Sequence, residues 1–167
     1  MPEALLGFGA NLGDARATLG GAVSAFCDGE TVRLLARSSD YRTPPWGFAD
    51  QPPFINLCIA VETTLPPRAL LDRAFTVEAA FGRNRATERR WGPRALDIDI
   101  LTYGNLAIDE PGLTVPHPRL RERAFVLVPL AEIRPTFALE GEPIVDALKR
   151  LDTTGIARLP TPSATAS

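Results

Sequence analysis

The chain has 167 residues, of which 45% are hydrophobic and 23% charged, and its formal net charge is −2 at pH 7. That length fits one domain, and the composition is typical of a globular protein, which excludes a disordered, collagen-like or membrane-embedded chain. The balance of charge argues against a general binder of nucleic acid or of membrane surfaces.

Cysteine and histidine are scarce, since Cys27, Cys58 and His117 are the whole complement. The two cysteines are too far apart in sequence for a metal ribbon or a redox pair, and a single histidine excludes a three-histidine zinc site. No apolar run is long enough to cross a bilayer, and the chain start lacks the basic and apolar segments of a secretion signal. We therefore expect a cytoplasmic protein.

Strands and helices are predicted to alternate from the start of the chain. Residues 4–10 predict a buried strand, and Asp14 is a candidate N-cap for a helix whose apolar positions run from Leu19 to Phe26. Residues 31–39 predict a second strand. A proline-rich loop is expected over 41–53, and such loops often carry function.

The clearest strand covers Phe54 to Thr63, where apolar side chains alternate on one face. A second helix begins at Pro66 and Pro67 and ends near Gly82, a typical left-handed C-cap. An arginine-rich loop over 83–94 and a strand over 95–103 follow.

This βαββαβ order predicts an α+β, ferredoxin-like sandwich, with two helices covering a four-stranded antiparallel sheet. C-terminal additions follow it: a loop over 109–118, one or two short helices over 120–133 broken at Pro129, and a helix over 144–151. We expect a single domain over residues 1–159 and a disordered tail over 160–167.

Asp97 and Asp99 carry the strongest chemical signal. The strand period of two places both carboxylates on one face, while Leu96, Ile98 and Ile100 face the other way. Two neighbouring carboxylates need partners, and divalent cations are one solution. Ion pairs with Arg90 and Arg94 are the structural alternative.

The loop over 83–94 holds five arginines and one acidic residue, Glu88. Such a run is either a solvated loop or a clamp for phosphate oxygens, which guanidinium groups bind in bidentate geometry. The adjacent acidic pair favours the clamp, because Mg²⁺ typically joins carboxylates to substrate phosphates. Trp91 within this loop either covers an aromatic ring or fills the core.

Asn56 offers both a donor and an acceptor and is a candidate for contacting the edge of a heterocycle, although a buried core asparagine is the alternative. Trp46, Phe54 and Phe125 are candidate stacking partners. The glycine-rich start at 7–13 lacks the spacing of a phosphate-binding loop, and small residues on a central strand explain it.

Seven motifs together resemble the 6-hydroxymethyl-7,8-dihydropterin pyrophosphokinase family over nearly the whole chain. They are Gly9 to Asp14, Tyr41 to Pro45, Gln51 to Asn56, Glu78 with Gly82 to Arg85, Arg90 to Leu101, Val115 to Pro118, and Arg123 to Leu127. The block from Arg90 to Leu101 is the most specific.

The resemblance implies transfer of pyrophosphate from ATP to a pterin hydroxymethyl group, with release of AMP, in folate biosynthesis. It implies two Mg²⁺ ions held by Asp97 and Asp99, small-molecule substrates rather than nucleic acid or membrane, and a monomer. Catalytic residues would be Arg83, Arg85, Arg90, Trp91, Arg94, Asp97 and Asp99. ATP would contact Glu78, Arg85, Arg90, Trp91, Arg94, Ile100, Thr114, His117 and Arg123. The pterin would contact Thr43, Pro44, Trp46, Phe54, Asn56, Trp91, Asp97 and Phe125.

The sequence departs from the family pattern in the arginine loop, which is one residue longer, and at Phe54, where tyrosine is common. Two other functions fit parts of this pattern. An RNA-binding βαββαβ module is disfavoured because the acidic pair repels phosphate in the absence of metal. A Mg²⁺-dependent nuclease or other phosphotransferase would use the same carboxylates, but Asn56 and its aromatic neighbours favour a small heterocycle.

Overall fold

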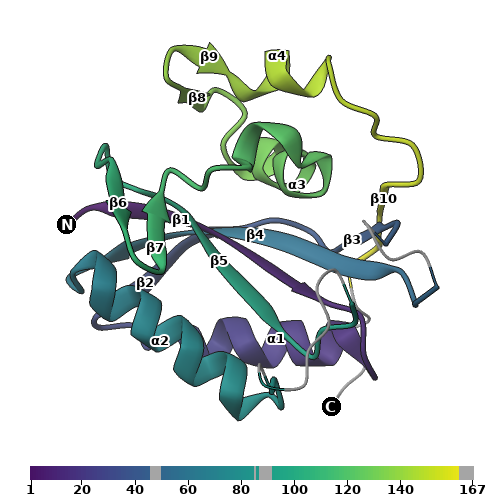
Figure 1. Cartoon of the computed structure of the whole chain (residues 1–167), viewed down its shortest axis with the longest axis horizontal. Coiled ribbons are helices and arrows are strands. Elements are labelled where there is room, and N and C mark those ends of the chain that lie inside the picture. Colours follow the sequence, from purple (N-terminus) through teal and green to yellow (C-terminus); the bar gives the residue numbers. More distant parts are fainter. Residues whose placement is uncertain (46–49, 85, 87–91, 162–167) are drawn as a thin grey trace.

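The computed structural model describes residues 1–45, 50–84, 86 and 92–161 (Figure 1). Its centre is a six-stranded sheet. The strands are β1 (Glu3–Ala10), β2 (Val32–Arg37), β3 (Tyr41–Thr43), β4 (Phe54–Thr63), β5 (Asp97–Tyr103) and β10 (Ala157–Arg158). β1 lies between β4 and β5, while β2 and β3 both pair with the other edge of β4 and β10 extends beyond β3. All these pairings are antiparallel.

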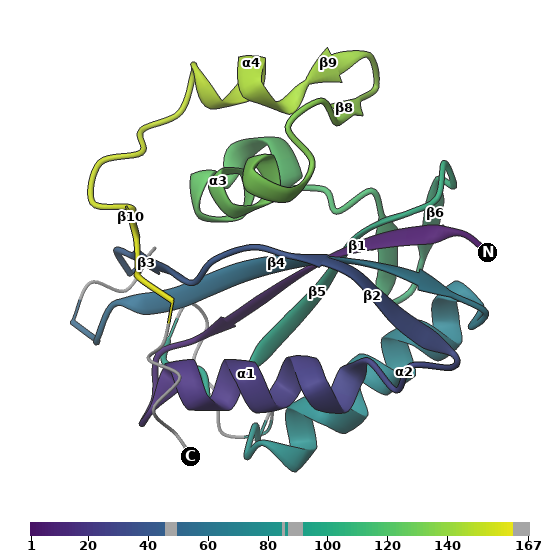
Figure 2. The ribbon, with the colours of Figure 1, turned by 180° about the vertical axis from the view of Figure 1, so that it is seen from behind.

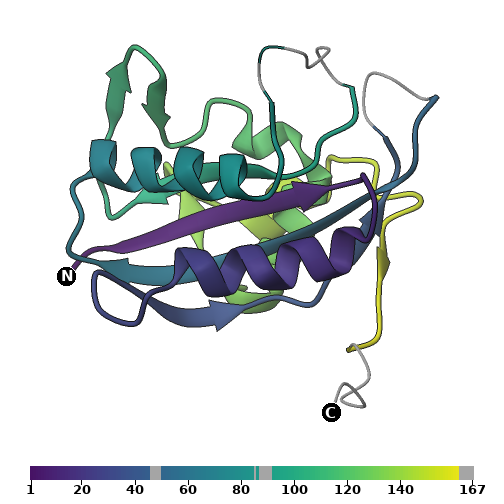
Figure 3. The same ribbon diagram turned by 90° about the horizontal axis from the view of Figure 1, so that it is seen from below.

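One face of the sheet is covered by α1 (Ala15–Phe26) and α2 (Pro67–Ala80), which lie side by side (Figure 3). The Asp14 side chain caps α1 by accepting a hydrogen bond of 3.1 Å from the Ala17 amide. α2 begins with proline at its first position and is followed by Gly82 at φ +95°, a conformation that favours glycine. The apolar sides of both helices share one core with β1, β4 and β5.

The opposite face is covered by α3 (Ala124–Ile133), with α4 (Ile144–Leu148) above it (Figures 1 and 2). A 3-10 turn over Leu120–Glu122 leads into α3, and its buried residues form a second core with β1, β4 and β5. Two small hairpins connect these elements. β6 (Ile108–Glu110) and β7 (Leu113–Val115) lie between β5 and α3, and β8 (Ala138–Leu139) and β9 (Glu142–Pro143) lie between α3 and α4. In the described part of the chain, no helix combines the length and apolar character needed to cross a membrane.

The strands and helices of the predicted βαββαβ order are present and the strands pair antiparallel, but β3 is inserted between β2 and β4, and the sheet has six strands where four were expected. The loop predicted over 41–53 contains β3, because Tyr41 and Thr43 find buried positions beside β4. The loop predicted over 109–118 holds the β6–β7 hairpin, and the helix predicted over 144–151 ends at Leu148. The expected tail falls mostly outside the described residues.

Pro129 does not break α3, which continues to Ile133. A proline inside a helix loses one backbone hydrogen bond and costs about 3 kcal/mol. Val126, Leu127 and Leu130 are buried in the second core. Burial of three such side chains offsets that cost, at about 1.5–3 kcal/mol each.

Candidate active site

A cavity of about 200 Å³ opens where β1, β3, β4 and β5 meet the segments leading to α3. Its walls are Gly9, Thr43, Pro44, Phe54, Asn56, Arg83, Gly92, Arg94, Asp97, Asp99, His117, Arg123 and Phe125. All but Gly9 and Gly92 are among the residues predicted above. The fold therefore gathers residues from distant parts of the sequence into one site.

The floor of the cavity is set by strand register. Gly9 on β1 pairs with Asn56 on β4 on one side and with Asp97 on β5 on the other. Paired residues of antiparallel strands share a face, and adjacent strands lie about 4.8 Å apart, so the amide and the carboxylate flank a gap about 10 Å wide. Glycine leaves that gap without a side chain.

The acidic pair is bound by arginines from two directions. Arg83 Nη1 donates to Asp97 Oδ1 at 2.9 Å, and Arg123 Nη1 lies 3.6 Å from Asp99 Oδ2. The structural alternative predicts ion pairs of these carboxylates with Arg90 and Arg94. Arg90 lies outside the described residues, whereas Arg94 lines the cavity.

Glu78 lies behind the cavity wall, 1% exposed, and does not line the cavity. Its Oε2 accepts from Arg83 Nη1 at 2.7 Å and from the Ile98 amide at 2.8 Å. Glu78 on α2 thus fixes Arg83 against β5, so the same guanidinium joins a buried carboxylate to Asp97.

Asp99 occupies an unfavourable position for a lone anion. Although 32% of its side chain is exposed, the surrounding protein raises its pKa to about 7 through burial, and the Asp97 carboxylate adds to the rise. Arg123 opposes this shift without cancelling it. A further positive charge in the cavity would stabilise the ionised form.

The donor set suits a hard divalent cation that brings other ligands with it. Within the described ranges, no group of three or more His, Cys, Asp or Glu side chains is placed to hold a metal ion. Mg²⁺ commonly binds through one or two carboxylates and fills its remaining positions with water and phosphate oxygens. Asp97 and Asp99 fit that role, and the incompletely compensated charge on Asp99 supports it.

His117 is held as a neutral imidazole. Its Nδ1 accepts a hydrogen bond of 3.1 Å from the Arg119 amide, which leaves the proton of the neutral ring on Nε2. Burial lowers its pKa to about 4, and the positive charge of Arg123 contributes. His117 therefore presents an uncharged N–H donor at neutral pH.

The opposite wall carries amide and aromatic groups. Asn56 Nδ2 donates to Thr43 Oγ1 at 2.8 Å, which turns Oδ1 toward Gly9. Phe54 and Phe125 both line the cavity, and the Arg123 guanidinium carbon lies 5.6 Å from the centre of the Phe125 ring. Arg123 therefore contacts both the acidic and the aromatic walls.

Asn11 is a buried polar residue that the sequence analysis missed. Its Nδ2 donates to Gln51 Oε1 at 2.9 Å and to the Pro52 carbonyl at 3.0 Å, while Oδ1 accepts from the Arg94 amide at 2.8 Å. One side chain thus joins the segment before β4 to the segment before β5. A polar residue directly after the strand predicted over 4–10 is the available local signal, and its partners lie 40 to 83 residues away.

Ile100 and Thr114 are predicted site residues that do not line the cavity. The Ile100 side chain is 5% exposed in the first core, and Thr114 on β7 is exposed, with its hydroxyl 3.4 Å from Asp109 Oδ1. Neither side chain lines the cavity. Trp46, Arg85, Arg90 and Trp91 lie outside the described residues.

Known proteins match the chain along most of its length. The family model for 7,8-dihydro-6-hydroxymethylpterin-pyrophosphokinase (HPPK) matches residues 5–135. The 2-amino-4-hydroxy-6-hydroxymethyldihydropteridine pyrophosphokinase of Methylorubrum extorquens is 50% identical over 159 residues, covering 95% of this chain and 99% of the relative. The protein of that name from Pseudomonas aeruginosa is 42% identical, covering 91% and 93%.

Solved structures share the fold at low sequence identity. A crystal structure of HPPK-DHPS in complex with substrates superposes with a TM-score of 0.67 at 15% identity, covering 89% of this chain and 43% of that chain. HPPK-DHPS of Plasmodium falciparum with pteroate gives a TM-score of 0.69 at 13% identity. This chain spans less than half of the length of those two-part proteins.

Proposed function

Since this chain belongs to the 7,8-dihydro-6-hydroxymethylpterin-pyrophosphokinase family, we propose that the cavity between Asn56 and Asp97 is where it transfers pyrophosphate. The reaction moves the pyrophosphoryl group of ATP to 6-hydroxymethyl-7,8-dihydropterin, giving AMP and the pterin diphosphate, in folate biosynthesis. The supporting observation is the side-chain-free gap at Gly9, which has the Asn56 amide on one side and the Asp97 carboxylate on the other.

The pterin would occupy the amide and aromatic side of the cavity. Asn56 Oδ1 would accept a hydrogen bond from the ring edge, because its Nδ2 already donates to Thr43. Phe54 and Phe125 would pack on the ring, with Pro44 beside them. The hydroxymethyl group would then extend toward Asp97.

The phosphates of ATP would occupy the arginine side. Arg83, Arg94 and Arg123 all line the cavity and would neutralise the phosphate oxygens, while the Nε2–H of His117 would donate a hydrogen bond. Glu78 would act through Arg83, which it holds in place. Ile100, Thr114 and the undescribed Arg85, Arg90 and Trp91 stay predicted contacts.

Asp97 and Asp99 would hold the two Mg²⁺ ions. When bound, these ions supply charge neutralisation at the phosphates and lower the pKa of the attacking hydroxyl group. The protein's own contribution is to orient two substrates in line and to keep compensating charges fixed before reaction. Asn56 and Asp97, on strands that both pair with β1, would provide the orientation. Arg83, Arg94 and Arg123 would provide the fixed charges.

Replacement of either aspartate tests the proposal. Asp97→Asn or Asp99→Asn keeps the side-chain shape but removes a charge, and AMP release should fall about 10²-fold or more. The thermal midpoint measured without ligands should stay close to that of the unmodified protein, because both groups lie at the cavity. Near-normal turnover of both variants would contradict the proposed site.

We also assign the core formed by β2, β4, β1, β5, α1 and α2 to the ferredoxin-like arrangement, in one domain over residues 1–159. The strand order and the shared cores on both sheet faces support this assignment. A monomer stays the prediction for the oligomeric state.

A further inference from the structure

A segment near the C-terminus runs along the sheet edge beside the pterin wall. β10 pairs with β3, with Ala157 opposite Arg42 and Arg158 opposite Tyr41 (Figure 1). The next residue along the chain continues the contact, because the Leu159 amide donates to the Asp40 carbonyl at 2.9 Å. β3 ends at Thr43 and is followed by Pro44, and both residues line the cavity.

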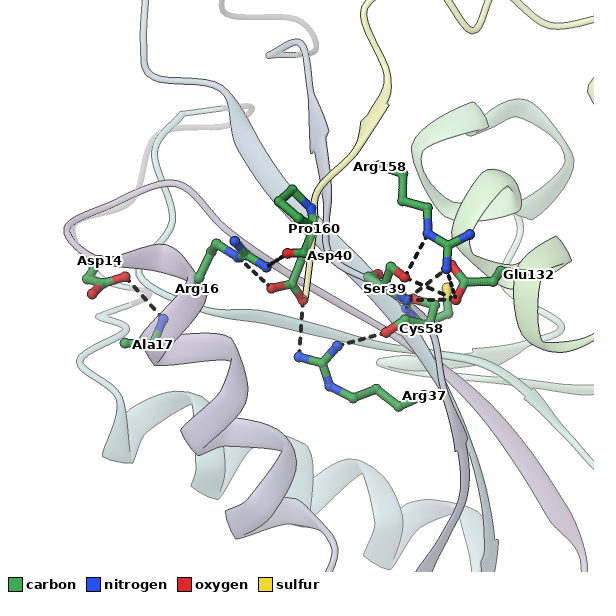
Figure 4. A network of polar contacts seen from close by, with 11 residues as sticks. Asp14, Arg16, Ala17, Arg37, Ser39, Asp40, Cys58, Glu132, Arg158 and Pro160 are labelled. Atoms are coloured by element: carbon green, nitrogen blue, oxygen red, sulfur yellow. Dashed lines mark hydrogen bonds and ion pairs between the residues drawn. The ribbon is translucent and has the colours of Figure 1, made fainter. Parts of the chain in front are cut away.

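Two ion-pair clusters hold this segment in place (Figure 4). Arg16 on α1 donates through Nε to Asp40 Oδ2 at 2.8 Å and through Nη2 to the Pro160 carbonyl at 2.6 Å. The Asp40 side chain is 1% exposed, and Arg37 Nη2 lies 3.1 Å from its other oxygen. Arg16 therefore fixes the start of β3 and the end of the segment together.

The second cluster lies on the α3 side. Arg158 Nε donates to Ser39 Oγ at 2.9 Å, and its Nη2 lies 3.6 Å from Glu132 Oε2. Glu132 also accepts from the Tyr41 hydroxyl at 2.6 Å. The segment is thus tied to residues on both sides of β3.

Gly155 lies against Pro44, a residue of the cavity wall. Gly155 has φ +85°, and a Cβ placed on it would lie 2.9 Å from Pro44 Cγ and 3.6 Å from Pro44 Cδ. A proline ring has little freedom to move aside, so any side chain at position 155 would push Pro44. The backbone at Gly155 therefore packs directly against a wall residue of the cavity.

From these contacts we propose that residues 153–160 brace the pterin wall, with Gly155 as a positioning residue for Pro44 and, through β3, for Thr43. Thr43 in turn fixes the amide of Asn56. The inference rests on the proposed function and adds that a segment outside the cavity sets the affinity for the pterin. ATP binding, on the opposite wall, should be largely independent of it.

Gly155→Ala tests the brace, with Gly141→Ala as its matched control. Gly141 is also exposed and has φ +83°, but nothing lies within 4 Å of its would-be Cβ. Both variants carry the same backbone strain, and only one pushes Pro44. We expect Gly155→Ala to raise KM for the hydroxymethylpterin about tenfold, with KM for ATP changed less than about twofold and Gly141→Ala close to the unmodified protein.

A double variant separates positioning from general destabilisation. In a Pro44→Ala background the clashing ring is absent, so adding Gly155→Ala should change KM for the pterin less than about twofold. Equal pterin KM values for Gly155→Ala and Gly141→Ala, or parallel losses in KM for both substrates, would overturn the brace. Failure of the unmodified protein to release AMP from ATP and the pterin would instead overturn the proposed function, and the brace with it.

Discussion

Gly9 is a position in the site where an added side chain would clash severely. A Cβ at this position would lie 2.5 Å from Asn56 Oδ1, well inside contact distance. Gly9→Ala should displace the Asn56 amide and weaken pterin binding at least about tenfold, while binding of an ATP analogue alone is retained. Calorimetric titration of each ligand measures both effects.

Gly7→Ala is the control for that prediction. Gly7 lies on the same strand, and its would-be Cβ meets only Leu101 at 3.8 Å, an ordinary contact distance. The Gly7 variant should bind the pterin normally. Equal loss in both variants would mean that β1 itself, and not the Asn56 amide, is disturbed.

The lowered pKa of His117 predicts that the free energy of unfolding falls in acid. Its pKa is lowered from 6.5 to about 4, so between these values the unfolded chain binds a proton that the folded protein does not. The contribution of neutral His117 to the free energy of unfolding is complete above pH 6.5 and is lost as the pH falls toward 4.

His117→Asn removes that titration and keeps a neutral acceptor near the Nδ1 position. The unfolding free energy of the variant, measured by urea denaturation without ligands, should fall less steeply between pH 6.5 and 4 than that of the unmodified protein. Asp99 acts in the opposite direction, because its raised pKa makes the free energy of unfolding rise as the pH falls over this range. This contribution is common to both proteins, so it cancels when the unfolding free energy of one is subtracted from that of the other. If the unfolding free energies of the two proteins fell in parallel with pH, the lowered pKa of His117 would be contradicted.

The sequence pattern predicted the chemically distinctive residues that line the cavity, but not which residues lie opposite one another across it. Asp97, Asp99 and Asn56 stood out because polar groups interrupt apolar strands. The importance of Gly9 depends on its register with two other strands, and that of Asn11 on contacts with residues 40 and 83 positions away. Such long-range pairings leave no local pattern.

At the level of elements, α1 holds two adjacent glycines with different surroundings. A Cβ on Gly20 would meet nothing within 4 Å, whereas one on Gly21 would lie 3.0 Å from Phe81 Cε1. Gly20→Ala should raise the unfolding free energy by about 0.5–1 kcal/mol, because alanine loses less entropy in a helix.

Gly21→Ala has the same helix propensity but must push the Phe81 ring, so it should stabilise the protein less than Gly20→Ala or destabilise it. Thermal and urea denaturation of the pair give the comparison. A larger gain for Gly21→Ala would mean that α1 and α2 separate easily at this contact.

Elements with strong local signals were predicted well. α1, α2 and β4 combine a clear period with a cap or a proline at the start. β3 and the continuous α3 were missed for a shared reason, since each depends on burial against β4 and not on its own sequence. Three residues between a turn and two prolines carry too little pattern to predict a strand.

For the whole molecule, the two cores on opposite faces of one sheet should unfold together. Leu127 is fully buried in the second core and Leu19 in the first. Truncation of either to alanine should cost about 2–5 kcal/mol, and each variant should keep a single unfolding transition.

Val145→Ala, at a position 40% exposed on α4, is the control and should cost much less. Urea denaturation followed by circular dichroism gives all three values. A two-step transition for Leu127→Ala would show that the layer formed by α3 and α4 unfolds separately from the sheet.

The second layer is also the main feature that the sequence did not predict. The βαββαβ order accounted for α1 and α2, while the segment after β5 was expected only as additions of unspecified position. Cys58 and Ala60 on the other face of β4 are buried beneath α3. The local sign of this layer in the sequence is that β4 has apolar residues on both faces. A short apolar run alone does not show which element packs against it.

The bond from Arg16 to the Pro160 carbonyl spans 144 residues, and this separation bears on how the protein is made. During translation, α1, β3 and Pro44 leave the ribosome long before Pro160 has been synthesised. Under the proposed brace, a nascent chain can assemble most of the sheet before the segment that supports Pro44 exists. Support of Pro44 must therefore wait until residues 153–160 have been synthesised.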